Sequence, residues 1–195
     1  MKILVLHLSL LFLSFSINAK QVFLGPSNNS QEEIQEALID LEPGDILTLK
    51  PGEYFFEDGL SLDIDDVIFE GSGIDETILN FENQMSGAQG LLVTSNGVTI
   101  RDFAVLDAKG DAIKVIGADG IKMIRLRTEW TGGPKETNGA YGFYPVESKD
   151  VLIDGCVAIG ASDAGIYVGQ SQNIIVKNSI AQYNVAGIEI ENSFY

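Results

Sequence analysis

The residues best suited to chemistry gather in and just before a set of short apolar strands. They are carboxylates, tyrosines and one lysine: Asp111, Lys114, Tyr141, Tyr144, Asp163, Tyr167 and Glu189. Tyrosine rings offer faces on which sugar rings can pack, and carboxylates and a cation can bind hydroxyl or charged groups. Together these residue types predict a groove for an oligosaccharide, provided that the fold brings them onto one face.

A sequence repeat predicts such a fold. The motifs GLLV, DAIKV, YGFYPV, AGIYV and AGIEI place Leu91, Ile113, Phe143, Ile166 and Ile188 at intervals of 22, 30, 23 and 22 residues. A second series, NGVTI, DGIKM, KDVLI and QNIIV, places Val98, Ile121, Val151 and Ile174 at intervals of 23, 30 and 23 residues. In both series the interval of 30 residues falls at the same place and exceeds the usual 23 by seven. This indicates one insertion between Met123 and Phe143.

A period of 22–23 residues made of short alternating strands is typical of a β-solenoid. Helical bundles are excluded by the period-2 alternation, and an antiparallel sandwich does not repeat in register. One set of residues per coil is expected to face a common core: Val98, Ile100 and Phe103; Val151, Ile153 and Cys156; Ile174, Val176 and Ser179. Coils stacked about 4.8 Å apart would bring the seven polar and aromatic residues within about 15 Å of one another.

The segment 20–44 predicts a cap for the first coil. Ser30 followed by Glu33 has the pattern of a capping box, and Pro43-Gly44 stops a helix. Four apolar residues between these signals share one helical face: Ile34, Ala37, Leu38 and Leu41. We therefore expect a short amphipathic α-helix that covers the open end of an all-β solenoid spanning 45–195.

The opening IQEAL…PGDILTLKPGEY and the coils NGVTIRD and QNIIVKNS resemble the exported right-handed parallel β-helix proteins of the pectate-lyase-like superfamily. The resemblance covers residues 30–195. It implies a right-handed parallel β-helix and a secreted or periplasmic location. It does not select an activity, because the same coil carries lyases, epimerases, hydrolases and non-catalytic modules.

The stretch YGFYPV is similar to the YGFDPH motif of bacterial mannuronan C5-epimerases. Four positions match: Tyr141, Gly142, Phe143 and Pro145. Tyr144 and Val146 stand where that family has aspartate and histidine. The resemblance implies that this face carries catalytic residues and that Tyr141 takes part in moving the proton of a uronate.

Proton abstraction next to a carboxylate needs a base and a group that neutralises the developing charge. The candidates for the base are Tyr141 and Lys114, and Lys114 or a bound Ca²⁺ would neutralise the charge. Ca²⁺ could take oxygen ligands from Asp111, Asp163 and Glu189. Alternatively, Asp163 and Glu189 could form the carboxylate pair of a glycoside hydrolase. Tyr141, Lys114 and Asp163 are therefore the catalytic candidates.

Substrate binding is expected from five residues: Tyr144, Tyr167, Trp130, Asp111 and Glu189. Trp130, the only tryptophan, lies in the inserted segment TEWTGGPKETNGAYG, and loops inserted into solenoids usually lie on the functional face. Trp130 could form a wall beside the tyrosines, or it could fold back over its own loop. Each tyrosine or charged residue could also be an ordinary ladder or surface residue.

Residues 1–19, MKILVLHLSLLFLSFSINA, have the pattern of a secretory signal peptide cleaved after Ala19. Cleavage would remove His7, the only histidine, and with it histidine-based acid–base catalysis and histidine-ligated metal sites. Cys156 is the only cysteine, so we expect a buried free thiol and no internal disulfide. No later segment is long and apolar enough to insert into a membrane.

The formal net charge of −16 argues against nucleic acid and anionic membrane surfaces as partners. It disfavours an anionic polysaccharide too, unless a cation or a local lysine intervenes. The sequence stops in mid-coil at AGIEIENSFY, so we expect either a β-helix truncated at its C-terminal end or end-to-end self-association through the uncapped coil.

These patterns predict an exported β-helix protein with lyase- or epimerase-like action on a uronate-containing polysaccharide. The alternative is a non-catalytic glycan-binding or structural β-helix module. A periplasmic accessory role in metal handling fits poorly with a mature chain that lacks histidine and has one cysteine.

Overall fold

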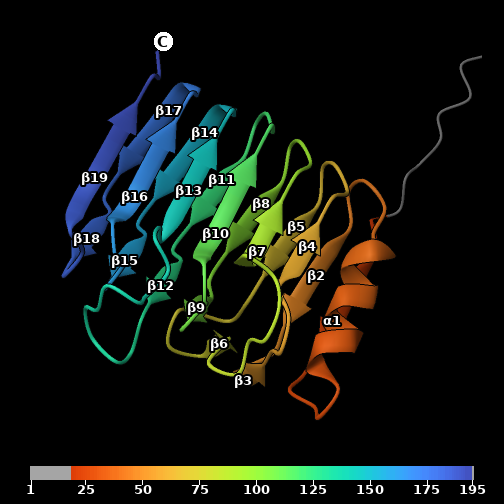
Figure 1. Cartoon of the computed structure of the whole chain (residues 1–195). Coiled ribbons are helices and arrows are strands. Elements are labelled where there is room, and N and C mark those ends of the chain that lie inside the picture. The colour runs from red at the N-terminus through yellow and green to blue at the C-terminus, as the bar shows by residue number, and fades with distance from the viewer. Residues whose placement is uncertain (1–18, 195) are drawn as a thin grey trace, which may run out of the picture.

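The computed structural model describes residues 19–194. The predicted signal peptide, apart from Ala19, lies outside these residues. The chain forms a stack of coils with three parallel sheets along its sides, and helix α1 (Ser30–Ile39) lies at one end of the stack (Figure 1). Between residues 19 and 194, no helix is long and apolar enough to cross a membrane.

Each sheet takes one strand from successive coils. Sheet A contains β1 (Gln21–Leu24), β2 (Ile46–Leu49), β5 (Ile68–Glu70), β8 (Thr99–Arg101), β11 (Lys122–Ile124), β14 (Lys149–Asp154) and β17 (Gln172–Lys177). Sheet B contains β3 (Gly52–Phe55), β6 (Thr77–Asn80), β9 (Ala104–Leu106), β12 (Arg127–Glu129), β15 (Val157–Ile159) and β18 (Ile180–Gln182). Sheet C contains β4 (Leu60–Leu62), β7 (Gln89–Val93), β10 (Asp111–Ile116), β13 (Phe143–Val146), β16 (Ala164–Gly169) and β19 (Ala186–Glu191).

Residues at equivalent positions of the sequence repeat pair with one another in these sheets. Ile113 pairs with Leu91 on one side and with Phe143 on the other, and Ile166 pairs with Ile188 further along sheet C. All strand pairs are parallel, because each strand meets its equivalent in the next coil. The predicted all-β parallel solenoid with one N-terminal helix is confirmed.

The inward positions of the coils form one continuous apolar core. The residues predicted to face it are buried in the coil of Val98 and in that of Val151, while Ile174 and Val176 of the last complete coil are partly buried against it. Cys156 is a buried free thiol, as expected, and burial raises the pKa of its thiol to about 11.

The corners between sheets A and B use a left-handed backbone conformation in every coil from β8 onward. One position per coil has positive φ: Asp102 (63°), Arg125 (47°), Gly155 (66°) and Asn178 (52°). Aspartate, asparagine and glycine tolerate this region best. The Arg125 guanidinium also bonds the Asp102 carboxylate, with an Nε–Oδ1 distance of 2.6 Å. These residues are therefore structural turn residues.

Helix α1 covers the first coil with the face that carries Ile34 and Leu38, both buried. The start of the helix differs from the expected capping box. Ser30 is the first helical residue, its hydroxyl donates to the Ser27 carbonyl, and the Ser27 hydroxyl donates to Glu33. Asn29 takes the N-cap position expected for Ser30, and it makes no side-chain cap hydrogen bond. Strand β1, which the sequence pattern did not predict, adds to the edge of sheet A.

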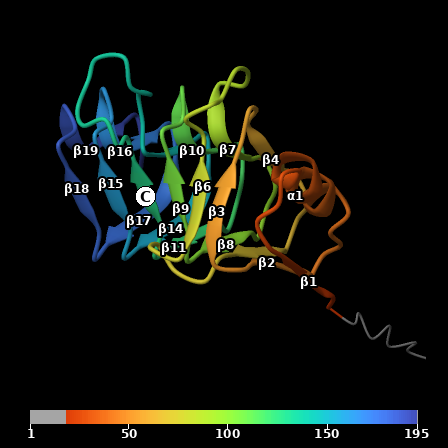
Figure 2. The same ribbon diagram turned by 90° about the horizontal axis from the view of Figure 1, so that it is seen from below.

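The inserted segment is the connection between β12 and β13, residues 130–142. Thr128 pairs with Ala158 in the next coil, so the coil is still in register at β12 and resumes it at β13. Figure 2 shows this teal loop projecting past the neighbouring coils at the corner between sheets B and C.

Removing the Leu38 side chain should destabilise the protein, because Leu38 is fully buried between α1 and the first coil. We expect Leu38→Ala to lower the free energy of unfolding by about 2–5 kcal/mol. Its neighbour Ile39 is 58% exposed, so Ile39→Ala should change it by less than about 0.5 kcal/mol. Urea denaturation measures both, and equal effects would contradict the packing of α1 as a cap.

Candidate functional site

The candidate site lies on the outer face of sheet C. Lys114 pairs with Leu92 on one side and Tyr144 on the other, and Tyr167 pairs with Glu189. Outward side chains of successive coils stack into a column because the coils share one register. Leu92, Lys114, Tyr144, Tyr167 and Glu189 therefore form one column on this face, which brings four of the seven predicted residues together.

Three tyrosines form the centre of the site, and we name Tyr141, Tyr144 and Tyr167 the tyrosine cluster. The ring centroid of Tyr141 lies 4.7 Å from that of Tyr144 and 4.5 Å from that of Tyr167. Tyr144 meets Tyr167 edge-on at 5.2 Å. All three side chains are partly exposed. Rings in mutual contact stabilise one another and present a preformed aromatic surface.

The local sequence explains how Tyr141 joins the cluster. Tyr141 lies at the end of the inserted loop, where its carbonyl accepts the N–H of Ala112. The next coil has the small residue Ala164 near this position, and Gly142 N–H donates to the Ala164 carbonyl. A short side chain there leaves space for the Tyr141 ring to stack on Tyr167. Asp163 precedes Ala164 by one residue.

Gly142 is required by close packing beneath the cluster. A Cβ atom at this position would lie 2.5 Å from the Gly165 carbonyl oxygen and 2.5 Å from the Thr128 hydroxyl. The glycine of the YGFYP stretch therefore lets the strand that carries the tyrosines approach the next coil.

Charged groups surround the tyrosine cluster. The Lys114 ammonium lies 4.7 Å from the centroid of the Tyr144 ring, in cation–π range. The Tyr167 hydroxyl donates to the Glu191 carboxylate at 2.7 Å. Glu191 was not among the predicted site residues, although it follows Glu189 by two positions and so shares its outward face on β19.

The environment keeps the phenol groups protonated at neutral pH. Burial, followed by the negative charge of Asp163, raises the pKa of Tyr141 to about 12. The hydrogen bond to Glu191 raises the pKa of Tyr167. Burial also raises the pKa of Asp111, against the opposing effect of Lys114. Because its phenol stays protonated, Tyr141 is better suited to donate a hydrogen bond than to act as the base.

Trp130 does not take part in this surface, which corrects the expectation of an aromatic wall. It is only 5% exposed, and its indole N–H donates to the Ala108 carbonyl at 2.7 Å. The other segments of the inserted loop are mostly polar and exposed, so the burial of Trp130 anchors the loop to the coil. The Trp130 side chain is thus folded back, as in the alternative to an aromatic wall, and does not project toward the tyrosines.

Among residues 19–194, no group of three or more His, Cys, Asp or Glu residues is arranged to hold a metal ion. Asp111, Asp163 and Glu189 all influence the pKa of Tyr141 and so lie around it. Their role as calcium ligands stays a prediction.

Titration can test whether the Asp163 carboxylate affects the pKa of the Tyr141 phenol. Because the carboxylate of Asp163 helps to raise the pKa of Tyr141, Asp163→Asn should shift this phenol toward its ordinary value of 10.0. Ultraviolet titration of tyrosinate measures the change, with Tyr141→Phe identifying the transition near pH 12. Asp119→Asn, at an exposed carboxylate paired with Lys149, is the control. An unchanged transition in Asp163→Asn would contradict the proximity of these groups.

Comparison with solved structures shows the same fold in proteins of low sequence identity. The catalytic domain of a GH87 alpha-1,3-glucanase, solved with tetrasaccharides, has a TM-score of 0.69 and 17% identity over 89% of this chain. The A-module of a mannuronan C-5 epimerase from Azotobacter vinelandii has a TM-score of 0.65 and 19% identity over 88%. A pectate lyase has a TM-score of 0.55 and 15% identity over 88%.

This chain spans only part of those proteins: 31% of the glucanase chain, 53% of the epimerase module and 56% of the pectate lyase. No curated protein matches its sequence. Residues 63–194 match the family described as right handed beta helix region, which agrees with the stacked parallel sheets and supplies the handedness expected from the sequence. The protein belongs to the right-handed β-helix family.

Proposed function

We propose that this protein binds a polysaccharide on the outer face of sheet C, with the tyrosine cluster as the platform for sugar rings. The observation that carries the proposal is the contact of three partly exposed rings from two adjacent coils. Aromatic faces with hydrogen-bonding tips suit sugars, which have apolar C–H faces and polar hydroxyl edges. Asp111, Glu189 and Glu191 add acceptors for those hydroxyl groups.

The structural relatives support a glycan as the partner. A glucanase, a mannuronan epimerase and a pectate lyase all act on polysaccharides, and the glucanase structure contains tetrasaccharides. A solenoid face suits a linear polymer because equivalent positions recur along the coil axis. We propose that the protein is exported, in keeping with the signal-like N-terminus and with the extracellular location typical of such proteins.

We propose a uronate-containing polysaccharide as the preferred class. Lys114 is the cation that lies against the tyrosine cluster, so its ammonium can bind a sugar carboxylate. The neighbouring carboxylates oppose an anionic ligand, and a Ca²⁺ ion bridging them to the sugar would remove that repulsion. Binding should therefore depend on Lys114, on Ca²⁺, or on both.

Lyase- or epimerase-like catalysis is the second candidate function. The raised pKa of Tyr141 keeps its phenol protonated, so within the YGFYP stretch it can donate a hydrogen bond to the substrate, which leaves Lys114 or Asp163 as the base. Lys114 would also stabilise negative charge that develops on the substrate. Self-association through the C-terminal coil stays a separate prediction.

Loss of a cluster ring should weaken glycan binding. We expect Tyr144→Ala and Tyr167→Ala to reduce affinity for pectate or alginate fragments about two- to tenfold, the effect of one aromatic contact. Tyr183, which is 69% exposed and outside the cluster, provides the matched control Tyr183→Ala. Isothermal titration calorimetry with and without Ca²⁺ measures the effect. Equal affinities in all variants would overturn the proposal.

Catalysis can be separated from binding with the same polymers. A lyase would release unsaturated sugars that absorb in the ultraviolet, and an epimerase would change the uronate signals in proton NMR spectra. We expect Tyr141→Phe to abolish either activity while retaining binding, since the phenyl ring still packs on Tyr167. Glycan binding without either product in the unmodified protein would establish a binding module and reject the enzyme.

A further inference from the structure

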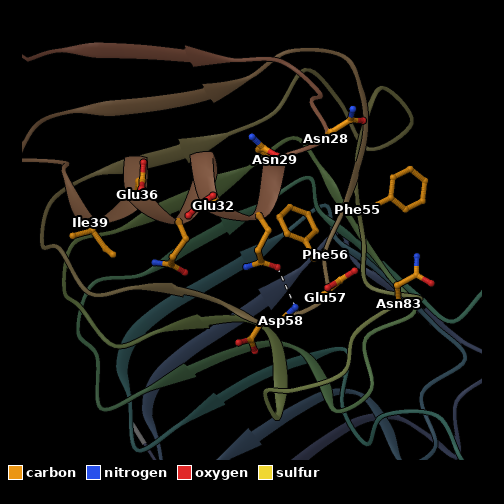
Figure 3. A pocket seen from close by; sticks show the side chains of 12 residues that line it. Asn28, Asn29, Glu32, Glu36, Ile39, Phe55, Phe56, Glu57, Asp58 and Asn83 are labelled. Atoms are coloured by element: carbon orange, nitrogen blue, oxygen red, sulfur yellow. Dashed lines mark hydrogen bonds between the residues drawn. The ribbon is translucent and has the colours of Figure 1, made fainter.

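A second concave surface lies at the opposite end of the β-helix, between α1 and the first coils (Figure 3). It forms a cavity of about 630 Å³ that is open to solvent on one side. Small-molecule and sugar sites commonly occupy about 300–1,000 Å³. This cavity is therefore large enough for one or two sugar rings, and it is distant in sequence from the tyrosine cluster.

The helix that caps the core also forms one wall of this cavity. Its buried face carries Ile34 and Leu38, whereas residues 31, 32, 35, 36 and 39 recur on the other side at helical spacing. The facing wall comes from residues 55–58, which follow and include the end of β3, together with Asn83. Figure 3 shows side chains from both walls around the cavity.

Hydrogen bonds hold the two walls at a fixed separation. The Gln31 side-chain oxygen accepts the N–H of Asp58 at 3.0 Å. The Gln35 amide both accepts from and donates to the backbone of Ser61, at 2.9 and 3.0 Å. Because its oxygen is bound to Asp58, Gln31 keeps its NH₂ group as a donor for a ligand. The site is thus organised before a ligand enters.

The lining has a chemistry that selects a neutral, hydroxyl-rich ligand. Amides and carboxylates line the cavity: Asn28, Asn29, Gln31, Gln35 and Asn83; Glu32, Glu36, Glu57 and Asp58. The Gln35 amide already bonds the Ser61 backbone in both directions, so the donors for a ligand are the Gln31 NH₂ group and the asparagine amides, and the carboxylates accept. The lining includes no lysine, arginine or histidine, so a uronate or phosphate would meet uncompensated negative charge. Sugar hydroxyl groups satisfy both kinds of side chain.

An aromatic side chain completes the site. Phe55 lines the cavity and leaves 50% of its surface exposed. The C–H face of a sugar ring can pack on the exposed part of this phenylalanine ring. Ile39, 58% exposed at the last position of α1, lines the end of the cavity opposite Phe55 (Figure 3).

From this geometry we propose that the cavity between α1 and residues 55–58 is a binding site for a neutral saccharide. Phe55 packs against the sugar face, Gln31 donates to ring or hydroxyl oxygens, and the carboxylates accept from hydroxyl groups. The site is separate from the tyrosine cluster and does not depend on the function proposed for that cluster.

The test uses the protein and short neutral gluco- and galacto-oligosaccharides in isothermal titration calorimetry, with amide chemical-shift mapping by NMR. We expect shifts of the Gln31 and Asn83 side-chain NH₂ signals. Phe55→Ala should weaken binding about two- to tenfold. Phe23, 54% exposed on sheet A and away from the cavity, gives the matched control Phe23→Ala, which should bind normally.

Two further variants identify the site and the ligand class. Tyr183→Ala, at an exposed tyrosine outside both surfaces, should leave neutral-saccharide binding unchanged. Glu32→Gln with Glu36→Gln keeps hydrogen-bonding capacity but removes charge, so saccharide binding should persist. Binding of spermidine alone, lost in that double variant, would show a cation site and overturn the proposal. Absence of saccharide binding, or equal binding in Phe55→Ala and Phe23→Ala, would also overturn it.

Discussion

The parallel register between coils is the constraint on which the rest of this structure depends. Each strand donates and accepts backbone hydrogen bonds with its equivalents in the coils before and after it. A slip of one residue would turn every inward side chain outward, so burial of residues such as Ile113 and Phe143 fixes the register. The same register fixes the outer face, which places Lys114 beside Tyr144 and Tyr167 beside Glu189.

The inserted loop shows how a coil accepts extra residues without losing that register. The burial of Trp130 and its hydrogen bond to the Ala108 carbonyl secure the beginning of the loop. Small residues secure its end: a Cβ atom at Gly139 would lie 1.6 Å from the Gly110 carbonyl oxygen. Tyr141 follows directly and can lean onto the next coil. The loop contributes to the candidate site by positioning Tyr141 rather than by offering its own tryptophan.

Electrostatics distinguishes the two surfaces that we consider functional. The tyrosine cluster has Lys114 against one ring, while burial and the carboxylates around it raise the pKa of Tyr141. The cavity at α1 has carboxylates and amides with no cation in its lining. A strongly acidic protein can thus present one surface suited to a charged sugar and another suited to a neutral one, because the local charge and not the net charge decides binding.

The sequence by itself determined the coil period, the inward residues, the capping helix and the outward column of the tyrosine cluster, because period-2 alternation and a fixed repeat constrain positions directly. Only the tertiary structure decided that Trp130 is buried, that Tyr141 stacks on Tyr167 over Ala164, and that Glu191 bonds Tyr167. It also formed the cavity between α1 and residues 55–58. These features depend on side-chain packing and on loop paths, which no repeat encodes, and on contacts between segments far apart in the chain.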